Sequence, residues 1–557
     1  MPSFSQLRSL AILAVSMALL NLSGLCAAQN SSAVQTAALN GRFRIAGTVV
    51  SVTGGHPLAR ARVLIIDARN PQNIQSFVTS EDGRFEFQVN AGKYALQGAR
   101  RGFLTAAYDA HDQFSTAIVT GTGLDTENLV LRLAPAAVLS GRVLDEFGDP
   151  VRHAAIMVYR EDHYSGVGLI RPFRRGSTDD QGTYEVMPLN DGTYFLSVSA
   201  KPWYAVHPVS TQSGSETSPS HVDPSLDVTY PSTYYGDATE ADEAMPIPVR
   251  GGDHLEVDVH LNPVPALHLI FHVPEDATRG ISWPVLQKPA FDGMESVQTD
   301  GVQMVSPGVY EMTGVAPGRY TVRMPGATTG QLEAPAEMDV TQQGQELDVS
   351  SGEPTSKVKA SVQLRSGGAI PTELRVFLRN SKKRIVAVAQ VDAKGEVDFQ
   401  DVSPGKYDVL AGFQNKEYSV VRIASQSGRT SGHALNVPAA SSLTVSLWLV
   451  EGIGIVEGFA KQGGKSVAGA MVVLVPKDPE SNRELFRRDQ SDLDGSFSLK
   501  GVVPGSYTIT AIDNGWDLDW AKPAVIAHYC QHAQKLVVGE RAKGSVFLTN
   551  PVEVQPR

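Results

Sequence analysis

The sequence predicts an all-β protein, a tandem row of about five antiparallel β-sandwich domains. Three observations predict this fold. A glycine motif in two halves recurs five times along the chain. Apolar and polar residues alternate after its glycines, which is the period of a strand with one buried face. Turn formers are abundant, with 51 Gly and 33 Pro among 557 residues.

The repeated motif pairs one glycine before an alternating segment with a second glycine before a tyrosine. The first copy reads GRFEF at 83–87 and GKYAL at 92–96. The other copies lie at 182–186 and 192–196, 308–312 and 318–322, 395–399 and 405–409, and 495–499 and 505–509. The second glycine follows the first after 9 residues in the first copy and after 10 in the other four. Such regular spacing indicates one structural unit used repeatedly.

Each half of the motif has a mechanical explanation. The first glycine usually follows a polar residue, as in Asp82-Gly83, and supplies the positive φ of a tight hairpin. The second glycine follows proline in three copies, at Pro317, Pro404 and Pro504. It leads into a strand that opens with tyrosine. We expect that tyrosine to bury its ring and to bond its hydroxyl to nearby backbone.

The spacing of the repeats sets the expected domain boundaries. Successive turn glycines are 99, 126, 87 and 100 residues apart, and a sandwich of some seven strands needs about 100 residues. No convincing helical period separates the strands, which argues against a parallel α/β sheet. The expected parts are a signal peptide (1–28), a linker (29–40), module 1 (41–134), module 2 (135–263) with an insertion rich in Ser, Pro and aromatic residues (201–247), a degenerate module 3 (264–352), module 4 (353–448) and module 5 (449–557) with a C-terminal extension.

The N-terminal segment is typical of a Sec-type signal peptide. Arg8 precedes an apolar run at 10–20, and small residues follow up to Ala28. The run is shorter than the ~20 residues that span a bilayer. We therefore expect cleavage after Ala28, a secreted or periplasmic protein, and no stable transmembrane anchor. Lipid attachment at Cys26 is disfavoured because Leu25 precedes it.

The layout of the repeated units resembles the carboxypeptidase regulatory-like domain family. That layout is G-x-V, a turn with proline, an apolar strand, a D-G-x-F hairpin and P-G-x-Y, and it matches best at 41–134, 135–200 and 449–512. The resemblance implies a transthyretin-like (prealbumin-like) sandwich, also grouped with a carbohydrate-binding-like fold. It further implies a module that is typically noncatalytic and attached to peptidases, envelope receptors or polysaccharide-handling proteins. The matching residues are turn and core residues, so the resemblance implies no site residues.

Motifs for metal or phosphate chemistry are few, and we expect no cofactor. The H-x-x-E match at 272–275 has proline between its ligands and is rejected as a zinc motif. The segment 458–466 (GFAKQGGKS) misses the phosphate-loop spacing by one residue, and a strand follows it where a helix is required. The remaining metal candidate is His528, Cys530 and His532. All three would share a face on a strand, but only the two histidines would on a helix.

Aromatic residues outside the strand pattern are the candidate ligand-binding residues. They are Trp203, Tyr204, Tyr230, Tyr234 and Tyr235 in the insertion, with Trp516 and Trp520 in module 5. Flat apolar rings beside polar groups are what sugar-binding surfaces use. The alternative is that the rings fold back over the sandwich as a cover, which is the commoner case. Both explanations stay open at this point.

These observations favour a noncatalytic protein that binds glycan or protein, or acts as a scaffold, at the bacterial cell envelope. A formal net charge of −11 argues against nucleic acid as a partner. Carbohydrate or other envelope proteins are the expected partners. One alternative is that the chain is, or accompanies, a carboxypeptidase-like or glycan-active enzyme. Another is a purely structural spacer.

Overall fold

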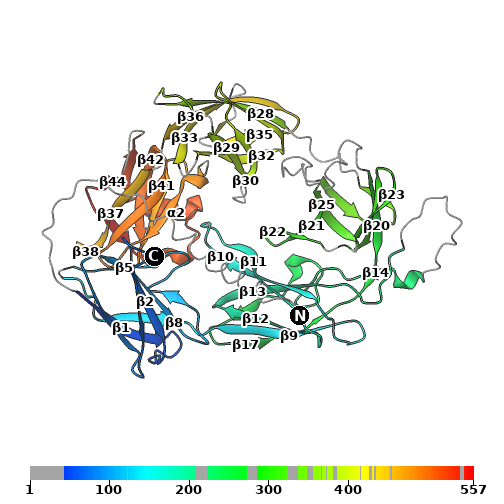
Figure 1. Cartoon of the computed structure of the whole chain (residues 1–557), viewed down its shortest axis with the longest axis horizontal. Coiled ribbons are helices and arrows are strands. Elements are labelled where there is room, and N and C mark those ends of the chain that lie inside the picture. Colours follow the sequence, from blue (N-terminus) through cyan, green and yellow to red (C-terminus); the bar gives the residue numbers. More distant parts are fainter. Residues whose placement is uncertain are drawn as a thin grey trace.

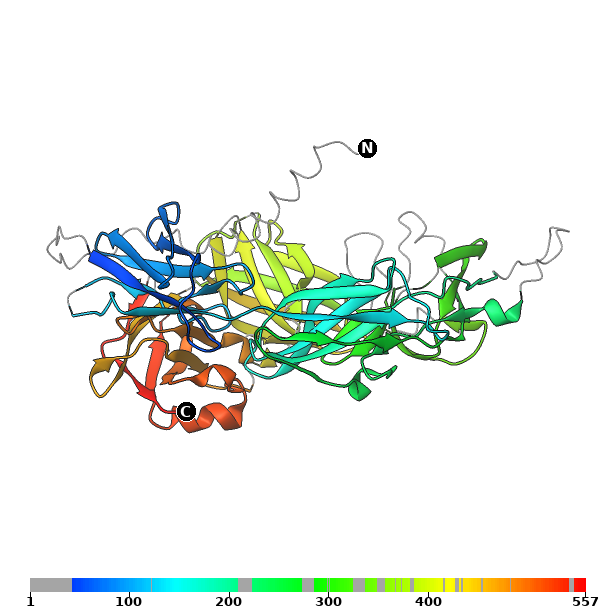
Figure 2. The same cartoon turned by 90° about the horizontal axis from the view of Figure 1, so that it is seen from below.

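Strands make up most of the protein (Figures 1 and 2). The computed structural model describes residues 43–557 except 122, 209–222, 273–284, 298, 300, 324–335, 348–355, 366, 372, 381–384, 414–415, 426–429, 432–433, 452–453, 481 and 540–544. The all-β prediction is confirmed. The expected signal peptide and linker lie outside the described residues. We keep the module numbers for the segments between the expected boundaries.

Module 1 stacks one sheet of order β4–β1–β8 on another of order β3–β2–β5, to which β6 and β7 also pair. Ile45, Val49, Phe85 and Leu131 are among the side chains buried between the two sheets. The strands are β1 (Phe43–Ser51), β2 (Arg62–Asp67), β3 (Ile74–Val78), β4 (Arg84–Val89), β5 (Lys93–Ala99), β6 (Ala106–Ala107), β7 (Ile118–Val119) and β8 (Leu129–Leu133).

Module 2 repeats this plan, with the sheets β12–β9–β17 and β11–β10–β13–β15. Part of its insertion forms the short strand β14, which pairs with β19 at the start of module 3. The elements are β9 (Ala137–Leu144), β10 (Ala155–Asp162), β11 (Leu169–Ser177), β12 (Thr183–Leu189), β13 (Gly192–Ser199), β14 (Val228–Thr229), β15 (Thr233–Tyr234), β16 (Ile247–Val249), β17 (His254–Glu256), β18 (Val259–His260) and the 3-10 helices η2 (Pro224–Leu226) and η3 (Ala241–Glu243).

Module 3 has the same arrangement of two stacked sheets, although its sequence motifs are degenerate. Its sheets have the orders β23–β24–β20–β27 and β22–β21–β25–β26. Leu269, Phe271, Tyr310 and Val340 lie in the core between them. The strands are β19 (Val264–Pro265), β20 (Leu267–His272), β21 (Val285–Ala290), β22 (Gly293–Ser296), β23 (Gly301–Ser306), β24 (Val309–Val315), β25 (Gly318–Arg323), β26 (Ala336–Val340) and β27 (Gln345–Leu347).

Module 4 joins its two layers through β33, which pairs with β32 on one side and with β36 on the other. Its last strand reaches Glu451, three residues past the expected boundary at 448. The strands are β28 (Ser356–Leu364), β29 (Arg375–Asn380), β30 (Ile385–Gln390), β31 (Glu396–Val402), β32 (Gly405–Phe413), β33 (Lys416–Ser425), β34 (Thr430–Ser431), β35 (Ala434–Val437) and β36 (Ser442–Glu451).

Module 5 adds a helix to the strand plan, in the C-terminal extension where no helix was expected. Helix α2 (Pro523–Cys530) starts with proline at its first position and buries Ile526 and Tyr529 against the outer face of a sheet. The other elements are β37 (Gly454–Gln462), β38 (Lys465–Ser466), β39 (Met471–Pro476), β40 (Arg487–Gln490), β41 (Ser496–Val502), β42 (Gly505–Ile512), β43 (Gln534–Val538), β44 (Ser545–Phe547), β45 (Val552–Gln555) and the 3-10 helices η5 (Arg483–Leu485) and η6 (Gly515–Asp517).

The pairing within each module is mostly antiparallel, with parallel pairs that the sequence pattern did not predict. In module 5, β42 pairs in parallel with β45. The first long strand of each module also pairs in parallel with a strand near the module's end. The pairs are β1 with β8, β9 with β17 and β18, β20 with β27, β28 with β36, and β37 with β44 and β45. A parallel partner must arrive by a crossover, so the chain passes to the other sheet before it returns.

The turn glycines behave as the motif predicts. Their φ angles are +71° at Gly83, +67° at Gly182, +79° at Gly308, +79° at Gly395 and +82° at Gly495. This left-handed region is open to glycine and strained for other residues. Each of these glycines therefore ends a hairpin loop just before the strand that carries the alternating segment.

The predicted backbone bond of the tyrosine after each second glycine is also confirmed. Its hydroxyl donates to the carbonyl oxygen four residues earlier in all five copies. The bonds are Tyr94 to Asn90 (3.0 Å), Tyr194 to Asn190 (2.8 Å), Tyr320 to Ala316 (2.7 Å), Tyr407 to Ser403 (2.7 Å) and Tyr507 to Val503 (2.8 Å). Burial raises the pKa of Tyr320 to about 12. These hydroxyls therefore stay protonated and act as donors.

The modules follow one another around a closed circuit in Figure 1, so that the blue module 1 lies beside the orange and red module 5. A backbone hydrogen bond joins modules 1 and 5, because Leu493 N–H donates to the oxygen of Ala117 at 3.0 Å. Module 5 also meets module 2, where Ala521 N–H donates to the oxygen of Gly166 at 2.9 Å. Among the described residues, no helix has the length and apolar character needed to cross a membrane.

We predict that Tyr507→Phe weakens module 5. The change leaves the Val503 carbonyl without its hydroxyl donor, which costs about 1 kcal/mol of local stability. Hydrogen exchange of the β41 and β42 amides should become correspondingly faster. Tyr164→Phe is the control, because the Tyr164 hydroxyl bonds at the exposed surface to Gln113. Equal exchange in the two variants would show that the corner bond adds no stability.

Candidate functional site

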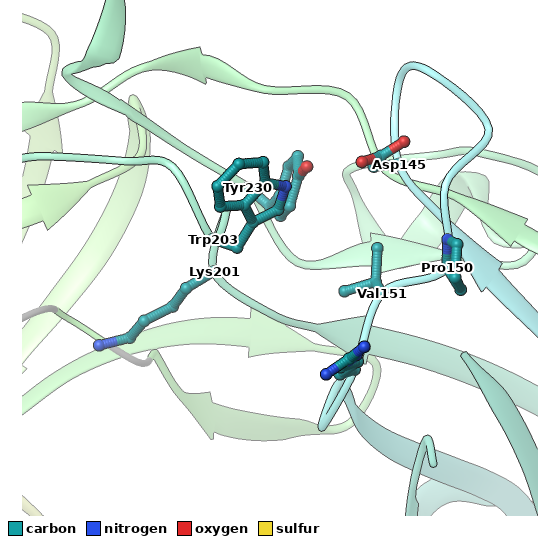
Figure 3. A pocket seen from close by; sticks show the side chains of 7 residues that line it. Asp145, Pro150, Val151, Lys201, Trp203 and Tyr230 are labelled. Carbon is teal, nitrogen blue, oxygen red and sulfur yellow. The ribbon is translucent and has the colours of Figure 1, made fainter. Parts of the chain in front are cut away.

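Three of the predicted aromatic residues meet beside one pocket of module 2. Figure 3 shows Trp203 and Tyr230 on one wall and the Asp145–Val151 turn on the other. Tyr204 packs against Trp203, with ring centroids 5.8 Å apart and nearly perpendicular planes. The pocket, called the Trp203 pocket below, has a volume of about 440 Å³ and is lined by Asp145, Pro150, Val151, Arg152, Lys201, Trp203 and Tyr230.

The turn between β9 and β10 forms one wall of the Trp203 pocket. Asp145 shapes this turn, because its Oδ1 accepts the backbone N–H groups of Phe147 (2.9 Å) and Asp149 (2.8 Å). Beyond the turn, Val151 N–H donates to the oxygen of Val143 at 2.9 Å. The Asp145 carboxylate is therefore a structural part of the wall.

Glu146 holds the opposite aromatic wall in place. The hydroxyls of Tyr204 and Tyr230 both donate to its carboxylate, the latter at 2.8 Å. Desolvation raises the pKa of Glu146, but the Tyr204 hydroxyl, the backbone N–H of Glu146 and the Tyr230 hydroxyl together outweigh it, and the pKa is lowered. In return, desolvation and the neighbouring carboxylate raise the pKa of Tyr204 to about 12. Glu146 is therefore an ionised acceptor that fixes both rings.

Trp203 is the exposed element of this group. Its exposed fraction is 87%, which is high for the largest apolar side chain. Arg152 lies exposed at the rim. Lys201 points away from the pocket in Figure 3, and its ammonium donates to the oxygen of Thr299 in module 3 at 3.2 Å. The pocket thus offers a flat apolar face beside a cationic donor.

The other two tyrosines of the insertion lie elsewhere. Tyr234 is buried where modules 2 and 3 meet, and its ring contacts Tyr159 and Phe291 at centroid distances of 6.5 and 5.7 Å. The Tyr159 hydroxyl donates to Glu295 of module 3 at 2.9 Å. Tyr235 packs half-buried against the core of module 2. Neither ring lines the Trp203 pocket.

Trp516 and Trp520 are buried in the contact that joins module 5 to the earlier modules. The Trp516 ring stacks on His111 of module 1, with centroids 4.9 Å apart and planes 7° apart. Trp520 packs against Phe486 in its own module and lies beside Gly166 of module 2. These two tryptophans cover a sheet and seal an interface, so the structure does not bring them together with the Trp203 pocket.

A buried guanidinium lies among these rings. Arg488, whose side chain is 4% exposed, lies 5.2 Å from the Trp516 ring centroid and 4.9 Å from that of Trp520. Its Nη2 donates to Asp112 of module 1 at 2.9 Å. Aromatic faces and a carboxylate together compensate the loss of hydration of this cation. The Arg488 side chain therefore links module 5 to module 1.

The remaining motif candidates are not assembled into sites. His528 and Cys530 lie two positions apart on α2 and His532 lies beyond its end, so the helix separates the predicted ligands. Burial raises the pKa of the Cys530 thiol, which disfavours the reactive thiolate. In the segment 458–466, β37 and β38 form a hairpin, and the strand β39 follows it as expected. Glu275 of the H-x-x-E match lies outside the described residues.

Sequence reasoning missed Glu146, Arg488 and Asp112. No motif marks them, because each acts through a partner that is distant in sequence. Asp112 and Arg488 are 376 residues apart, and Glu146 bonds to Tyr230 across 84 residues. The one local signal was the aromatic content of the insertion and of the segment around Trp516.

We predict that Arg488→Ala opens the contact between modules 1 and 5. The variant leaves Asp112 without its cation and removes the side chain that packs between the tryptophan rings. We expect the contact to lose about 3 kcal/mol or more of stability. Small-angle scattering should show a larger radius of gyration, and amides 109–117 should exchange faster. Arg483→Ala, which removes an exposed arginine of η5, is the matched control. Unchanged scattering in Arg488→Ala would contradict this role.

We predict that Asp489 makes module 5 more stable as the pH falls from about 6 towards about 4. Burial raises the pKa of Asp489 to about 6, although an N–H from Ser498 lowers it. An unfolded chain titrates this group near 4, so the folded form binds the proton more tightly. Stability from this group is present at low pH and lost as the pH rises through 6. Asp489→Asn should raise the free energy of unfolding at pH 7 and flatten its pH dependence.

Denaturant unfolding between pH 4 and pH 7 measures this effect. Asp478→Asn, which removes one exposed carboxylate from the same module, is the control for net charge. The expectation fails if the free energy of unfolding of Asp489→Asn depends on pH as steeply as that of the native chain.

The chain matches one protein family and several solved structures. No curated protein matches it significantly. The Bacillus anthracis TIE protein is 11% identical, covers 76% of each chain and has a TM-score of 0.17. The minor pilin GBS52 of Streptococcus agalactiae is 12% identical and covers 40% of this chain and 97% of its own, with a TM-score of 0.19. BcpA, the major pilin subunit of Bacillus cereus, is 9% identical over 73% of this chain and 99% of its own, with a TM-score of 0.14.

The family model that matches is the carboxypeptidase regulatory-like domain, and it covers residues 44–128. This segment begins in β1 and ends just before β8, so it spans the first copy of the glycine motif and its tyrosine corner. The residues that carried the resemblance, among them Gly83 and Tyr94, hold the hairpin and the corner in place. Residues 44–128 therefore match the carboxypeptidase regulatory-like domain in sequence, and the matching residues are those of the hairpin and the corner.

Proposed function

We propose that this chain is a secreted, noncatalytic protein of the bacterial cell envelope that binds carbohydrate at the Trp203 pocket, on a scaffold of five β-sandwich modules with the boundaries given above. The observation that carries the proposal is the exposed indole of Trp203 at the mouth of a pocket of about 440 Å³. Secretion rests on the signal-like segment at 1–28.

The chemistry of the pocket suits a sugar ring. The C–H face of a sugar packs on a flat aromatic face, and its hydroxyls need a few placed polar groups. Trp203 supplies the face, and the exposed Arg152 supplies charged donors at the rim. Tyr230 and Val151 add apolar surface below. A protein loop is the alternative occupant, and the binding experiment below separates the two.

The pocket walls are held before any ligand arrives. The Asp145 turn and the Glu146 bridge to two tyrosine hydroxyls fix both sides by hydrogen bonds. Preorganised walls reduce the entropy that binding must remove, so a small contact area can still give useful affinity. This favours a binding role over a purely structural spacer.

The acidic groups beside the pocket favour binding over glycan hydrolysis. Glycosidases need a carboxylic acid whose pKa is raised so that it can donate a proton. The pKa of Glu146 is instead lowered, because two tyrosine hydroxyls and a backbone N–H donate to its carboxylate. The Oδ1 of Asp145 is engaged by two backbone amides of its own turn. Both carboxylates therefore serve as acceptors that hold the walls.

We predict that Trp203→Ala weakens carbohydrate binding at least tenfold, which equals about 1.4 kcal/mol. A glycan array on the full mature chain identifies the ligand, and calorimetry with that glycan compares the variants. Phe547→Ala is the matched control, because Phe547 is also a strongly exposed aromatic residue but lies in module 5.

Three results would overturn the proposal. One is the absence of glycan binding by the native chain, and another is equal binding by the native chain and Trp203→Ala. The third is release of reducing ends from the bound glycan, which would make the chain an enzyme.

A further inference from the structure

We infer that His207, Asp227 and His268 form a binding site for a divalent transition-metal ion, best matched by Zn²⁺, where the insertion of module 2 meets module 3. His207 and Asp227 belong to the insertion, and Asp227 directly follows η2. His268 belongs to β20, the first long strand of module 3. The inference is independent of the carbohydrate proposal, because it concerns a different group of residues.

The three side chains have the proximity that a metal site requires. His207 Nδ1 lies 2.7 Å from Asp227 Oδ1, and His268 Nε2 lies 3.1 Å from Asp227 Oδ2. One ligand atom from each residue lies within 4.8 Å of the others. Tetrahedral zinc with ligands at about 2.0–2.1 Å places neighbouring ligand atoms roughly 3.4 Å apart. Side-chain shifts of about 1 Å therefore complete the geometry.

The three side chains are largely buried, and their surroundings are rich in negative charge. The side chains of His207, Asp227 and His268 are 6%, 18% and 3% exposed. A second carboxylate, Glu311, is 1% exposed and lies 3.0 Å from His268 Nδ1. Buried carboxylates are costly unless they are neutralised. A dication with two neutral imidazoles balances these two carboxylates, because the charges +2, −1 and −1 sum to zero.

Glu311 also orients the central histidine. When His268 donates its Nδ1–H to Glu311, the lone pair of Nε2 faces Asp227 and the proposed ion. A carboxylate behind a metal-bound histidine fixes its tautomer and strengthens it as a ligand. Of the two carboxylates beside the His268 imidazole, Asp227 would therefore be a metal ligand, and Glu311 a residue that positions the imidazole.

The backbone shows why these residues meet. The register of β20 against β24 shifts between Leu267 and Leu269, so that β24 carries an extra residue opposite His268. The bulge therefore lies in β24, and His268 keeps its place in the strand β20. The β14–β19 pair brings the insertion alongside, and Ala266 N–H donates to the oxygen of Asp227 at 2.9 Å. The site is therefore built on paired strands of both modules.

The donor set indicates which ion fits. Two imidazole nitrogens and one carboxylate oxygen suit zinc and its neighbours, whereas calcium and magnesium prefer oxygen ligands throughout. Three protein ligands leave a fourth position for solvent. The ion would tie the insertion that carries Trp203 to module 3, which makes its structural role the linking of two modules.

Calorimetry of the full mature chain, stripped with a chelator and titrated with Zn²⁺, tests the inference. We expect one tight site in the native chain. His207→Ala and Asp227→Asn should each weaken it about 100-fold, and Glu311→Gln about tenfold, through the orientation of His268. His260→Ala is the matched control, because His260 is an exposed histidine of the same module beside Asp237. His528→Ala with His532→Ala removes two exposed histidines outside the site and should leave it unchanged.

Two further readouts separate binding from folding damage. Circular dichroism of the metal-free variants should match that of the native chain. Co²⁺ should give visible bands of a tetrahedral nitrogen and oxygen site in the native chain and His260→Ala, and lose them in His207→Ala. Equal Zn²⁺ affinity in His207→Ala and the native chain, or no Zn²⁺ bound by the native chain, would overturn the inference. Loss of glycan binding in Trp203→Ala would leave it untouched.

Discussion

The turn glycine of the repeat is the constraint on which the sandwich depends. A Cβ at Gly83 would lie 2.7 Å from the oxygen of Val49, and the same collision recurs between Gly182 and Val143 at 2.8 Å. The hairpin approaches the first strand this closely because Val49 N–H donates to the oxygen of Gly83 at 2.8 Å. That bond sets the register of the whole sheet, and register decides which side chains face the core. The tyrosine corner then fixes the start of the strand in the opposite sheet.

Variation on this frame concentrates in two places, the insertion of module 2 and the extension of module 5. The insertion supplies Trp203 and Tyr230 to the pocket and Asp227 to the cluster at module 3. The extension supplies α2 and the tryptophan pair that closes on modules 1 and 2. Loops on a rigid scaffold are where binding residues gather in sandwich proteins, since the strands are constrained by packing.

The contact around Arg488 changes what kind of scaffold this is. Modules joined only in sequence could bend at every junction. Here module 5 is held to module 1 by a buried cation, stacked rings and backbone bonds. Module 2 is joined to module 3 by Tyr159 and Glu295. A chain whose distant modules meet holds its loops at defined mutual positions.

What the sequence by itself determined is local. Positive φ at Gly83, alternation along 84–87 and the corner hydroxyl of Tyr94 follow from residues that are neighbours in the chain. From these the all-β fold and the repeat could be predicted. Trp203 was one of seven candidate aromatic residues, but nothing in the sequence distinguished the exposed Trp203 from the buried Trp516. Both lie in irregular segments with polar neighbours.

Tertiary structure decided the rest, because the deciding contacts join residues far apart. Whether a tryptophan is a ligand surface or a seal depends on what packs against it, and His111 reaches Trp516 from more than 400 residues away. The parallel partner of each first strand, the Glu146 bridge and the meeting of His268 with Asp227 have the same origin. Local patterns encode periodicity and turns, whereas burial and charge pairing are settled only when the sheets have packed.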